Sequence, residues 1–147
     1  MKLILSFLFA LSILTACSYK QSELDAFDSQ IKRYNAKYQL KLEPTGSGLY
    51  LKIDSLGSGR AIQLQDSIWV SYTLKLLSGK IIEVQEQPVG MPLNGLIKAW
   101  QEALFGLPVG SSLRCIAPPQ LAYGQSGTDH IGKDKILYFK MKVIDAK

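Results

Sequence analysis

The chain has 147 residues with a formal net charge of +5, and 47% of its residues are hydrophobic. A length near 150 predicts one domain, and this hydrophobic content can form a packed core, so the composition excludes a large multidomain enzyme and a disordered chain. The lysines and arginines are spread along the sequence, and 2 cysteines with 1 histidine are too few for a closed zinc site, so we expect neither a nucleic-acid partner nor a metal.

The first sixteen residues have the pattern of an export signal. Lys2 precedes an apolar stretch over residues 3–14. At about 1.5 Å per residue this stretch covers roughly 18 Å, too short for a hydrocarbon core of about 30 Å. Leu14-Thr15-Ala16-Cys17 also resembles the lipobox of bacterial lipoproteins, in which the cysteine is acylated and becomes the new N-terminus. We expect a lipoprotein signal peptide over 1–16 and lipidation of Cys17; an ordinary cleaved signal that leaves this cysteine free is the alternative.

Lipidation would place the protein in the bacterial cell envelope, anchored to a membrane by several acyl chains and facing the periplasm. Ser18 leaves both the inner and the outer membrane open. Acylation of Cys17 leaves Cys115 as the one remaining thiol, so we expect no intramolecular disulfide. The apolar neighbours of Cys115 predict a buried core position.

Residues 17–47 are expected to form a lipidated tether and an amphipathic helix. Ser22 and Asp25 have the spacing of a loose capping box, and apolar side chains then recur at helical spacing, at Leu24, Phe27, Ile31, Tyr34 and Tyr38. We expect a helix over 22–38 whose apolar face packs against its own domain or against a second copy, which would form a homodimer. Pro44, Gly46 and Gly48 predict a linker before a domain over 48–147.

From residue 49 onward most segments have the pattern of strands. We expect strands at 49–53, 68–76, 81–84, 113–117 and 136–144, with a hairpin turn at Ser78-Gly79-Lys80. One stretch differs, because Asn94 can cap a helix, Gly106 can end it, and helical spacing relates Leu96, Ile97, Trp100 and Leu104. The predicted fold class is α+β, with a curled antiparallel sheet around one short helix, preceded by the N-terminal helix.

Four segments in order resemble the FKBP family of peptidyl-prolyl cis-trans isomerases, over residues 48–147. They are Val70-Ser71-Tyr72-Thr73, Ser78-Gly79-Lys80-Ile81-Ile82-Glu83, Pro92 to Leu104, and Ile116 to Gly124, with Leu137-Tyr138-Phe139 as the closing strand. The third is similar to the "PLNGVIPGWTEAL" segment of envelope FKBPs of the macrophage-infectivity-potentiator type. The resemblance implies the family's half barrel and a rotamase that binds proline-containing polypeptides, needs no cofactor and assists the folding of exported proteins.

The resemblance also implies a site. Trp100 would form the floor beneath the proline ring, with Tyr72 and Phe139 as walls. The Ile97 backbone N–H and the Tyr123 hydroxyl would donate hydrogen bonds to the substrate. Further substrate-binding positions fall at Ile82, Glu83, Val89 and Leu96. An apolar pocket of this kind favours a twisted, less dipolar X-Pro amide over the planar ground states.

The pattern departs from the family on one side of this site. Ile82-Glu83 replaces a Phe-Asp pair, an aromatic residue near Val89 is missing, and Leu74 stands where a glycine usually follows Tyr-Thr. The lost ring contacts predict an isomerase slower by about one or two orders of magnitude. A non-catalytic FKBP-like binding module or chaperone in an envelope complex, such as a motility or secretion machine, is one alternative. A structural lipoprotein whose barrel only packs is another.

Overall fold

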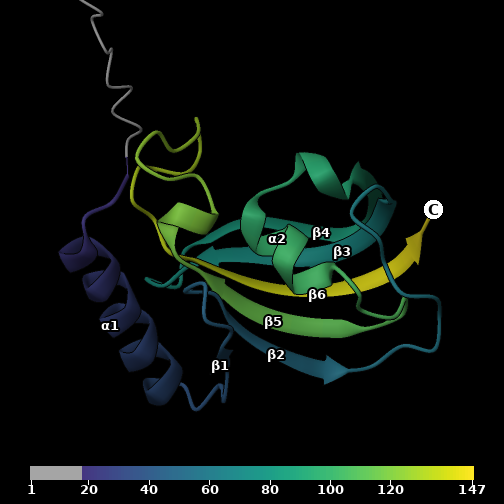
Figure 1. Cartoon of the computed structure of the whole chain (residues 1–147), viewed down its shortest axis with the longest axis horizontal. Coiled ribbons are helices and arrows are strands. Elements are labelled where there is room, and N and C mark those ends of the chain that lie inside the picture. The colour runs from purple at the N-terminus through teal and green to yellow at the C-terminus, as the bar shows by residue number, and fades with distance from the viewer. Residues whose placement is uncertain (1–17) are drawn as a thin grey trace, which may run out of the picture.

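The computed structural model describes residues 18–147 (Figure 1), so the predicted signal peptide and Cys17 lie outside the described residues. Two helices, α1 (Gln21–Lys37) and α2 (Lys98–Leu104), accompany the strands β1 (Glu43–Pro44), β2 (Tyr50–Ser55), β3 (Ser67–Leu76), β4 (Ile81–Pro92), β5 (Ser112–Ala117) and β6 (Leu137–Ala146). Single 3-10 turns lie at Leu93–Gly95 and Pro119–Leu121. Among these residues no helix is long and apolar enough to cross a membrane.

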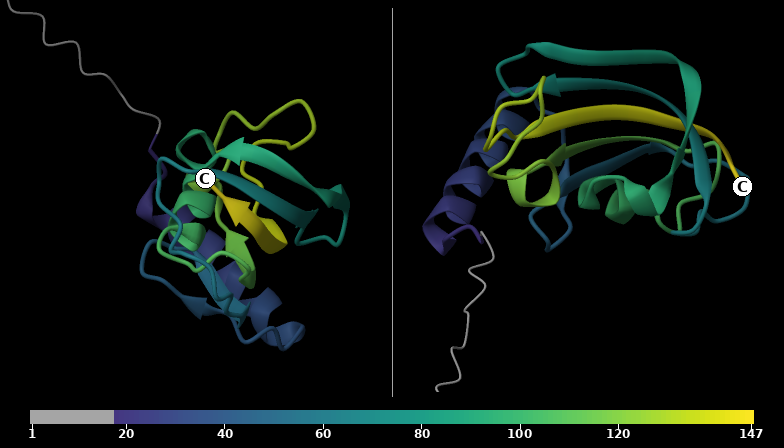
Figure 2. Two further views of the ribbon diagram at one scale, coloured as in Figure 1. Left: turned by 90° about the vertical axis from the view of Figure 1, so that its right-hand side faces the viewer. Right: turned by 90° about the horizontal axis from the view of Figure 1, so that it is seen from above.

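The strands form one antiparallel sheet in the order β1-β2-β5-β6-β3-β4. The sheet curls around α2, and α1 crosses one end of it on the opposite face (Figures 1 and 2). This arrangement confirms the predicted α+β class and the half barrel around one short helix. Because β6 lies between β5 and β3, its side chains occupy the middle of both faces.

Alternation along the central strands builds two hydrophobic clusters, one on each face of the sheet. Phe139 and Met141 of β6 join the inner cluster around α2, whereas Tyr138 joins an outer cluster under α1. In β5, Cys115 joins the inner cluster and Ile116 the outer one, and Cys115 is fully buried as predicted. Because side chains of a β-strand alternate between its two faces, the same strands pack against α2 on one face and against α1 on the other.

The helix predicted over 22–38 is confirmed as α1, shifted by one residue at each end. The predicted cap is wrong, because the Glu23 carboxylate accepts the backbone N–H of Lys20 at 2.8 Å, and Ser22 lies within the first turn. Phe27 and Ile31 are buried in the outer cluster, so this face packs against the chain's own sheet.

The strands differ most from the prediction at β1 and at the end of β4. The linker expected around Pro44 contains β1, where Glu43 and Pro44 pair with β2. The strand expected to end at residue 84 continues to Pro92. Val70 pairs with Val89 and Tyr72 with Gln85. One residue of β3 therefore lies opposite residues 86–88 of β4, which form a bulge. This bulge carries Pro88 on an edge strand, where a missing ladder hydrogen bond is tolerated.

The helix predicted from Asn94 is divided into two pieces. Leu93–Gly95 forms a 3-10 turn, and α2 begins only at Lys98 after the extended backbone of Leu96 and Ile97. Asn94 therefore does not cap α2. The predicted end is confirmed, because Gly106 follows the helix with φ +77°, a conformation that favours glycine.

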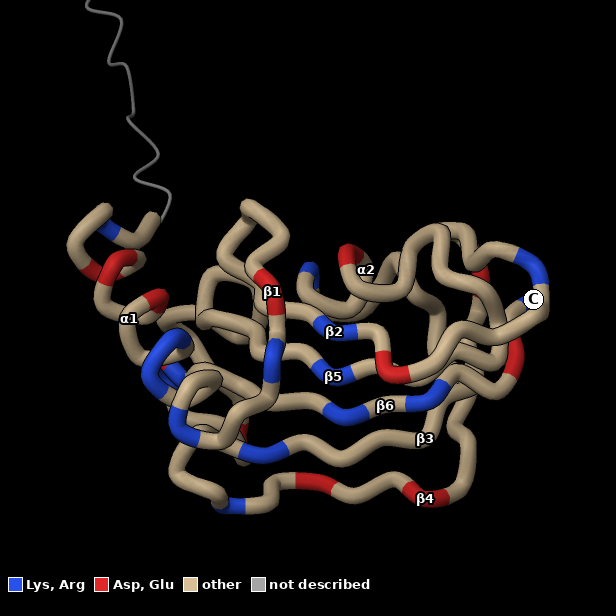
Figure 3. Tube along the Cα trace, turned by 90° about the horizontal axis from the view of Figure 1, so that it is seen from below, with Lys and Arg blue, Asp and Glu red and all other residues tan. Residues whose placement is uncertain are grey.

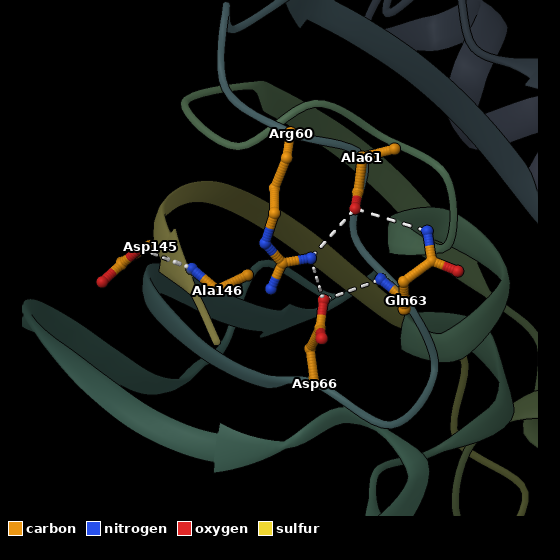
Figure 4. Close-up of polar contacts among 6 residues, drawn as sticks. All are labelled: Arg60, Ala61, Gln63, Asp66, Asp145 and Ala146. Carbon is orange, nitrogen blue, oxygen red and sulfur yellow. Dashed lines mark hydrogen bonds and ion pairs between the residues drawn. The ribbon is translucent and has the colours of Figure 1, made fainter.

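The segment that leads into β3 is held by a polar cluster (Figure 4). Asp66 accepts hydrogen bonds from the Arg60 guanidinium and from the Gln63 backbone N–H, both at 2.8 Å. The hydrogen bond and charge of Arg60 lower the pKa of the Asp66 carboxyl. The cluster fixes the start of β3, the strand that carries Tyr72.

Candidate functional site

A small cavity of about 70 Å³ lies between α2 and the concave face of the sheet. Its walls come from β3, β4, β6, the start of α2 and the loop after β5. The lining residues are Tyr72, Leu74, Glu83, Met91, Leu96, Ile97, Trp100, Tyr123 and Phe139. Segments far apart in the sequence therefore meet at one mostly apolar hollow.

Three aromatic rings form the centre of the cavity. The Trp100 ring lies edge-to-face with Tyr72, at a centroid distance of 5.0 Å and an angle of 86°. Phe139 meets the same ring at 5.5 Å and 84°. Such pairs contribute about 0.5–1.5 kcal/mol beyond area burial, so the indole is held rigidly from two sides. Trp100 is 4% exposed, and its Nε1 has no hydrogen-bond partner among residues 18–147.

The break between the 3-10 turn and α2 positions the backbone at the mouth of the cavity. The Gln101 side chain closes the break, since its Nε2 donates to the Leu96 carbonyl at 2.7 Å. Ile97 is the N-cap of α2 with φ −58° and ψ 151°, and its N–H has no acceptor within the described part of the chain. An extended residue before a helix leaves its N–H unused by the helix, so this group is available to a ligand.

The Tyr123 hydroxyl stands at the rim of the cavity. Tyr123 is 37% exposed and follows the turn at Pro119–Leu121. The Gly124 N–H donates to the Pro119 carbonyl at 2.9 Å, with φ +60° at Gly124, and this closes the turn. Burial and the charge of Glu83 raise the pKa of the Tyr123 hydroxyl, so it remains protonated and able to donate a hydrogen bond at neutral pH.

Tyr72 lies deeper against Trp100. Burial raises the pKa of its hydroxyl, and a hydrogen bond to Glu83 and the Glu83 charge raise it further. Both tyrosines are therefore neutral hydrogen-bond donors at physiological pH. The cavity combines apolar rings with a few donors, and its lining residues include no Cys, Ser, Thr, Lys or His.

The structure brings together seven of the nine predicted positions that we assigned to substrate contact, namely Tyr72, Glu83, Leu96, Ile97, Trp100, Tyr123 and Phe139. Ile82 and Val89 do not line the cavity. Ile82 falls at a register shift of β4, and Val89 lies opposite Val70 farther along the sheet.

Leu74 and Met91 line the cavity without having been predicted as contacts. From the sequence, Leu74 is identified only as a residue that stands where the family usually has glycine. Met91 belongs to the part of β4 beyond the bulge, where no strand was expected. One pattern in the sequence could have predicted that Leu74 lines the cavity. Residues two apart in a strand share a face, so Leu74 lies on the same face of β3 as Tyr72.

Within residues 18–147, no three His, Cys, Asp or Glu side chains lie close enough to hold a metal ion.

Comparison with known families identifies one model, described as FKBP-type peptidyl-prolyl cis-trans isomerase, which matches residues 58–144. The chain is 36% identical over 105 residues to the peptidyl-prolyl cis-trans isomerase Mip of Coxiella burnetii, covering 69% of this chain and 46% of that protein. It is 29% identical over 132 residues to FkpA of Escherichia coli, an FKBP-type isomerase, covering 85% and 49%. The chain thus spans about half the length of these relatives.

Solved structures show the same fold. A peptidyl-prolyl cis-trans isomerase from Pseudomonas syringae pv. tomato superposes with a TM-score of 0.74 at 25% identity, covering 88% of this chain and 97% of that one. The crystal structure of FkpA from Escherichia coli gives a TM-score of 0.70 at 25% identity, covering 86% and 64%. The similarity to the Pseudomonas syringae isomerase thus covers almost the whole of that chain.

Proposed function

The chain belongs to the FKBP-type peptidyl-prolyl cis-trans isomerase family, and we propose that it catalyses cis-trans isomerisation of X-Pro bonds in the cavity over Trp100. The observation that carries this proposal is the right-angled packing of Tyr72 and Phe139 on Trp100 at a cavity with free hydrogen-bond donors. Rotation about the amide has a barrier of about 18–20 kcal/mol because resonance is lost in the twisted state. The reaction breaks no covalent bond.

Desolvation supplies the first contribution to catalysis. A planar amide is strongly dipolar and loses hydration in an apolar cavity, whereas the twisted amide has less charge separation and loses less. The rings of Tyr72, Trp100 and Phe139 would contact the proline ring and exclude water around the C–N bond. Only this difference between ground and transition state accelerates the reaction.

Two hydrogen bonds supply the second contribution. The Ile97 N–H would bind a carbonyl of the substrate and fix its position relative to Trp100. The Tyr123 hydroxyl, kept protonated by its raised pKa, would donate to a second carbonyl. Positioning both sides of the proline lets the enclosed amide rotate while the flanking chain stays bound.

The decisive test measures isomerisation of short X-Pro peptides by NMR exchange, with matched Tyr→Phe variants. We expect Tyr123→Phe to lower kcat/KM by about tenfold, equivalent to one hydrogen bond of roughly 1.4 kcal/mol. Tyr138→Phe is the control, because Tyr138 lies on the opposite face of the sheet, in the outer cluster. Trp100→Phe should lower the rate more than Tyr123→Phe. Equal rates for all three variants and the unmodified protein would refute the site.

A specific observation favours the non-catalytic alternative, in which the domain binds proline-containing segments or a partner without isomerising them. Leu74 projects into the cavity where the family usually has glycine, and the remaining volume is only about 70 Å³. Peptide binding that Trp100→Phe weakens, with no acceleration of exchange by the unmodified protein, would support this function over catalysis.

For the cellular setting we propose a lipoprotein with a signal peptide over residues 1–16, acylated at Cys17 and facing the periplasm, where it assists the folding of exported proteins. The apolar stretch and lipobox-like segment support this setting. Labelled palmitate should be incorporated into the full chain and lost in Cys17→Ser, whereas Cys115→Ala should retain it. Label retained in Cys17→Ser would exclude this anchor. A homodimer through α1 remains a prediction, to be measured by light scattering.

A further inference from the structure

The outer face of the sheet gathers basic side chains that the sequence scatters. Figure 3 shows Lys and Arg positions side by side along β2, β5, β6 and β3. These positions alternate with residues of the inner cluster, so their side chains lie on the face away from α2. We call the set Lys52, Lys75, Arg114, Lys140 and Lys142 the outer basic face. Lys140 and Lys142 alternate with Phe139 and Met141 of the inner cluster, so the outer basic face and the cavity share β6.

The strand register places three of these cations in a row. Lys52 is directly opposite Arg114, and Arg114 is directly opposite Lys140. Directly opposite side chains have Cβ atoms about 4.5–5.5 Å apart, and like charges at such positions are unfavourable. The row therefore does not stabilise the sheet on its own, which points to a function in binding anions.

Few carboxylates neutralise this face. Asp54 binds Arg114 through both Nε and Nη2, with distances of 2.6–3.0 Å. Within residues 18–147, neither Lys52, Lys140 nor Lys142 takes part in a salt bridge. Lys75 lies over the Tyr138 ring, 4.5 Å from its centroid. Three ammonium groups are thus free to bind an external anion.

Arg114, Lys140 and Lys142 of the outer basic face line a broad shallow depression of about 800 Å³. Ser112 of β5 and Ser71 and Thr73 of β3 also line it, on either side of the two lysines of β6. Val84 and Glu86 of β4 contribute an apolar side chain and a second carboxylate at its edge. The depression spans the sheet from β2 to β4, long enough for an extended segment of chain.

We propose that the outer basic face binds an acidic segment of a partner polypeptide. Asp54 shows how a carboxylate is held here, in a bidentate contact with the one guanidinium of the face. The Arg114 guanidinium is the group on this face best suited to phosphate, and Asp54 already occupies it. The cations that remain free are lysine ammonium groups, which lie among hydroxyl donors. A segment that alternates carboxylates with small or polar residues complements such a surface.

The position of the N-terminal segment favours a polypeptide over a lipid surface. Ser18 and Tyr19 lie against residues 119–126, and the Tyr19 hydroxyl donates to Asp134 at 2.7 Å. Among residues 18–53, none lines the outer depression. The chain therefore enters the fold away from the outer basic face. This proposal does not rest on isomerase activity.

The test compares two variants that remove the same charge. Anisotropy of a labelled ten-residue glutamate-serine peptide reports binding to the purified protein, with a glutamine-serine peptide as the neutral probe. We expect the acidic peptide to bind more tightly than the neutral one, and Lys140→Gln with Lys142→Gln to weaken it about tenfold. Lys98→Gln with Lys133→Gln, on α2 and in the loop before β6, should leave the affinity within about twofold.

Several results would overturn the proposal. They are equal affinity for both peptides, equal weakening by both double variants, and binding unaffected by added salt, because charge pairing at a surface is screened. Phosphatidylglycerol vesicles or a single-stranded oligonucleotide bound through the same lysines, with the peptide unbound, would assign the face to another polyanion. If the β6 double variant fails to fold, Lys52→Gln tests the same row.

Discussion

Single hydroxyl groups have different tasks on the two faces of the sheet. The Tyr72 and Tyr123 side chains line the cavity, whereas the Tyr50 hydroxyl donates to Asp28 Oδ1 at 2.7 Å and ties β2 to α1. Asp28 also pairs with Lys32 at 2.8 Å, and this contact lowers the pKa of its carboxyl. Burial, followed by the Asp28 hydrogen bond, raises the pKa of Tyr50 to about 12.

The shifted Tyr50 pKa predicts a loss of stability in alkali. Its folded-state pKa of about 12 is above the ordinary value of 10.0 for a free tyrosine. This contribution is therefore complete below pH 10 and is lost as the pH rises toward 12. Urea unfolding between pH 7 and 11.5 should show a smaller alkaline loss for Tyr50→Phe. The exposed Tyr38→Phe should follow the unmodified protein, and identical curves for all three would contradict the prediction.

Leu74 has a structural role that its place in the cavity does not reveal. Its side chain is 3% exposed and packs in the inner cluster. Leu74→Ala should lower the free energy of unfolding by about 2–5 kcal/mol, because the truncation leaves a void. Leu56→Ala, in the exposed segment after β2, should change stability by less than about 0.5 kcal/mol. Similar urea midpoints for the two variants would show that Leu74 is not packed as described.

At the scale of elements, β5 and β6 each carry apolar side chains on the inner face and basic side chains on the outer face, and repulsion between the basic side chains lowers stability. The alternation of β6 keeps Met141 and Val143 buried while Lys140 and Lys142 are exposed. The inner row stabilises the sheet, and the outer row of Lys52, Arg114 and Lys140 repels itself. A surface that serves only solubility would interleave the two signs of charge.

This repulsion can be measured directly. Lys140→Thr should raise the free energy of unfolding by about 0.2–1 kcal/mol, because it removes a like charge opposite Arg114 and adds a β-branched residue beside Thr73. Lys142→Thr, opposite Ser112 and Ser71, should have a smaller effect. The gain should shrink in high salt, and destabilisation by Lys140→Thr at low salt would disprove the repulsive row.

At the scale of the whole molecule, residues 18–147 form one sheet with a helix on each face, so the two clusters share their strands. Asn35 connects α1 to the segment before β1. Its side chain donates to the Leu42 carbonyl at 2.9 Å and accepts from the Leu42 N–H at 3.1 Å. The N-terminal helix is therefore packed against the chain's own sheet, one of the two alternatives that its apolar face predicted. Residues 18–147 should unfold together.

A truncation in the outer cluster tests this cooperativity. Ile31→Ala, at a fully buried position of α1, should cost about 2–5 kcal/mol while unfolding remains a single transition. Far-ultraviolet circular dichroism and tryptophan fluorescence should give coincident curves, since Trp100 lies in the inner cluster. Two separate transitions would mean that α1 and the sheet are independent units.

Much of this molecule could be predicted because local patterns agree with the fold. The α1 stripe, the alternation of β3 and the glycine after α2 each have a local physical cause. The bulge of β4 and the break at Leu96 could not be predicted, because strand pairing and the Gln101 side chain determine them. The same holds for the outer basic face, whose members come from four strands and meet only through register.

The alternation of β6 also constrains how this protein can evolve. Substitutions at Lys140 or Phe139 change one face at a time. Insertion or deletion of one residue in the middle of β6 would instead exchange the faces beyond it, turning lysines toward α2 and apolar side chains toward water. Relatives that diverge at either surface should therefore differ here by replacement and keep the length of this strand.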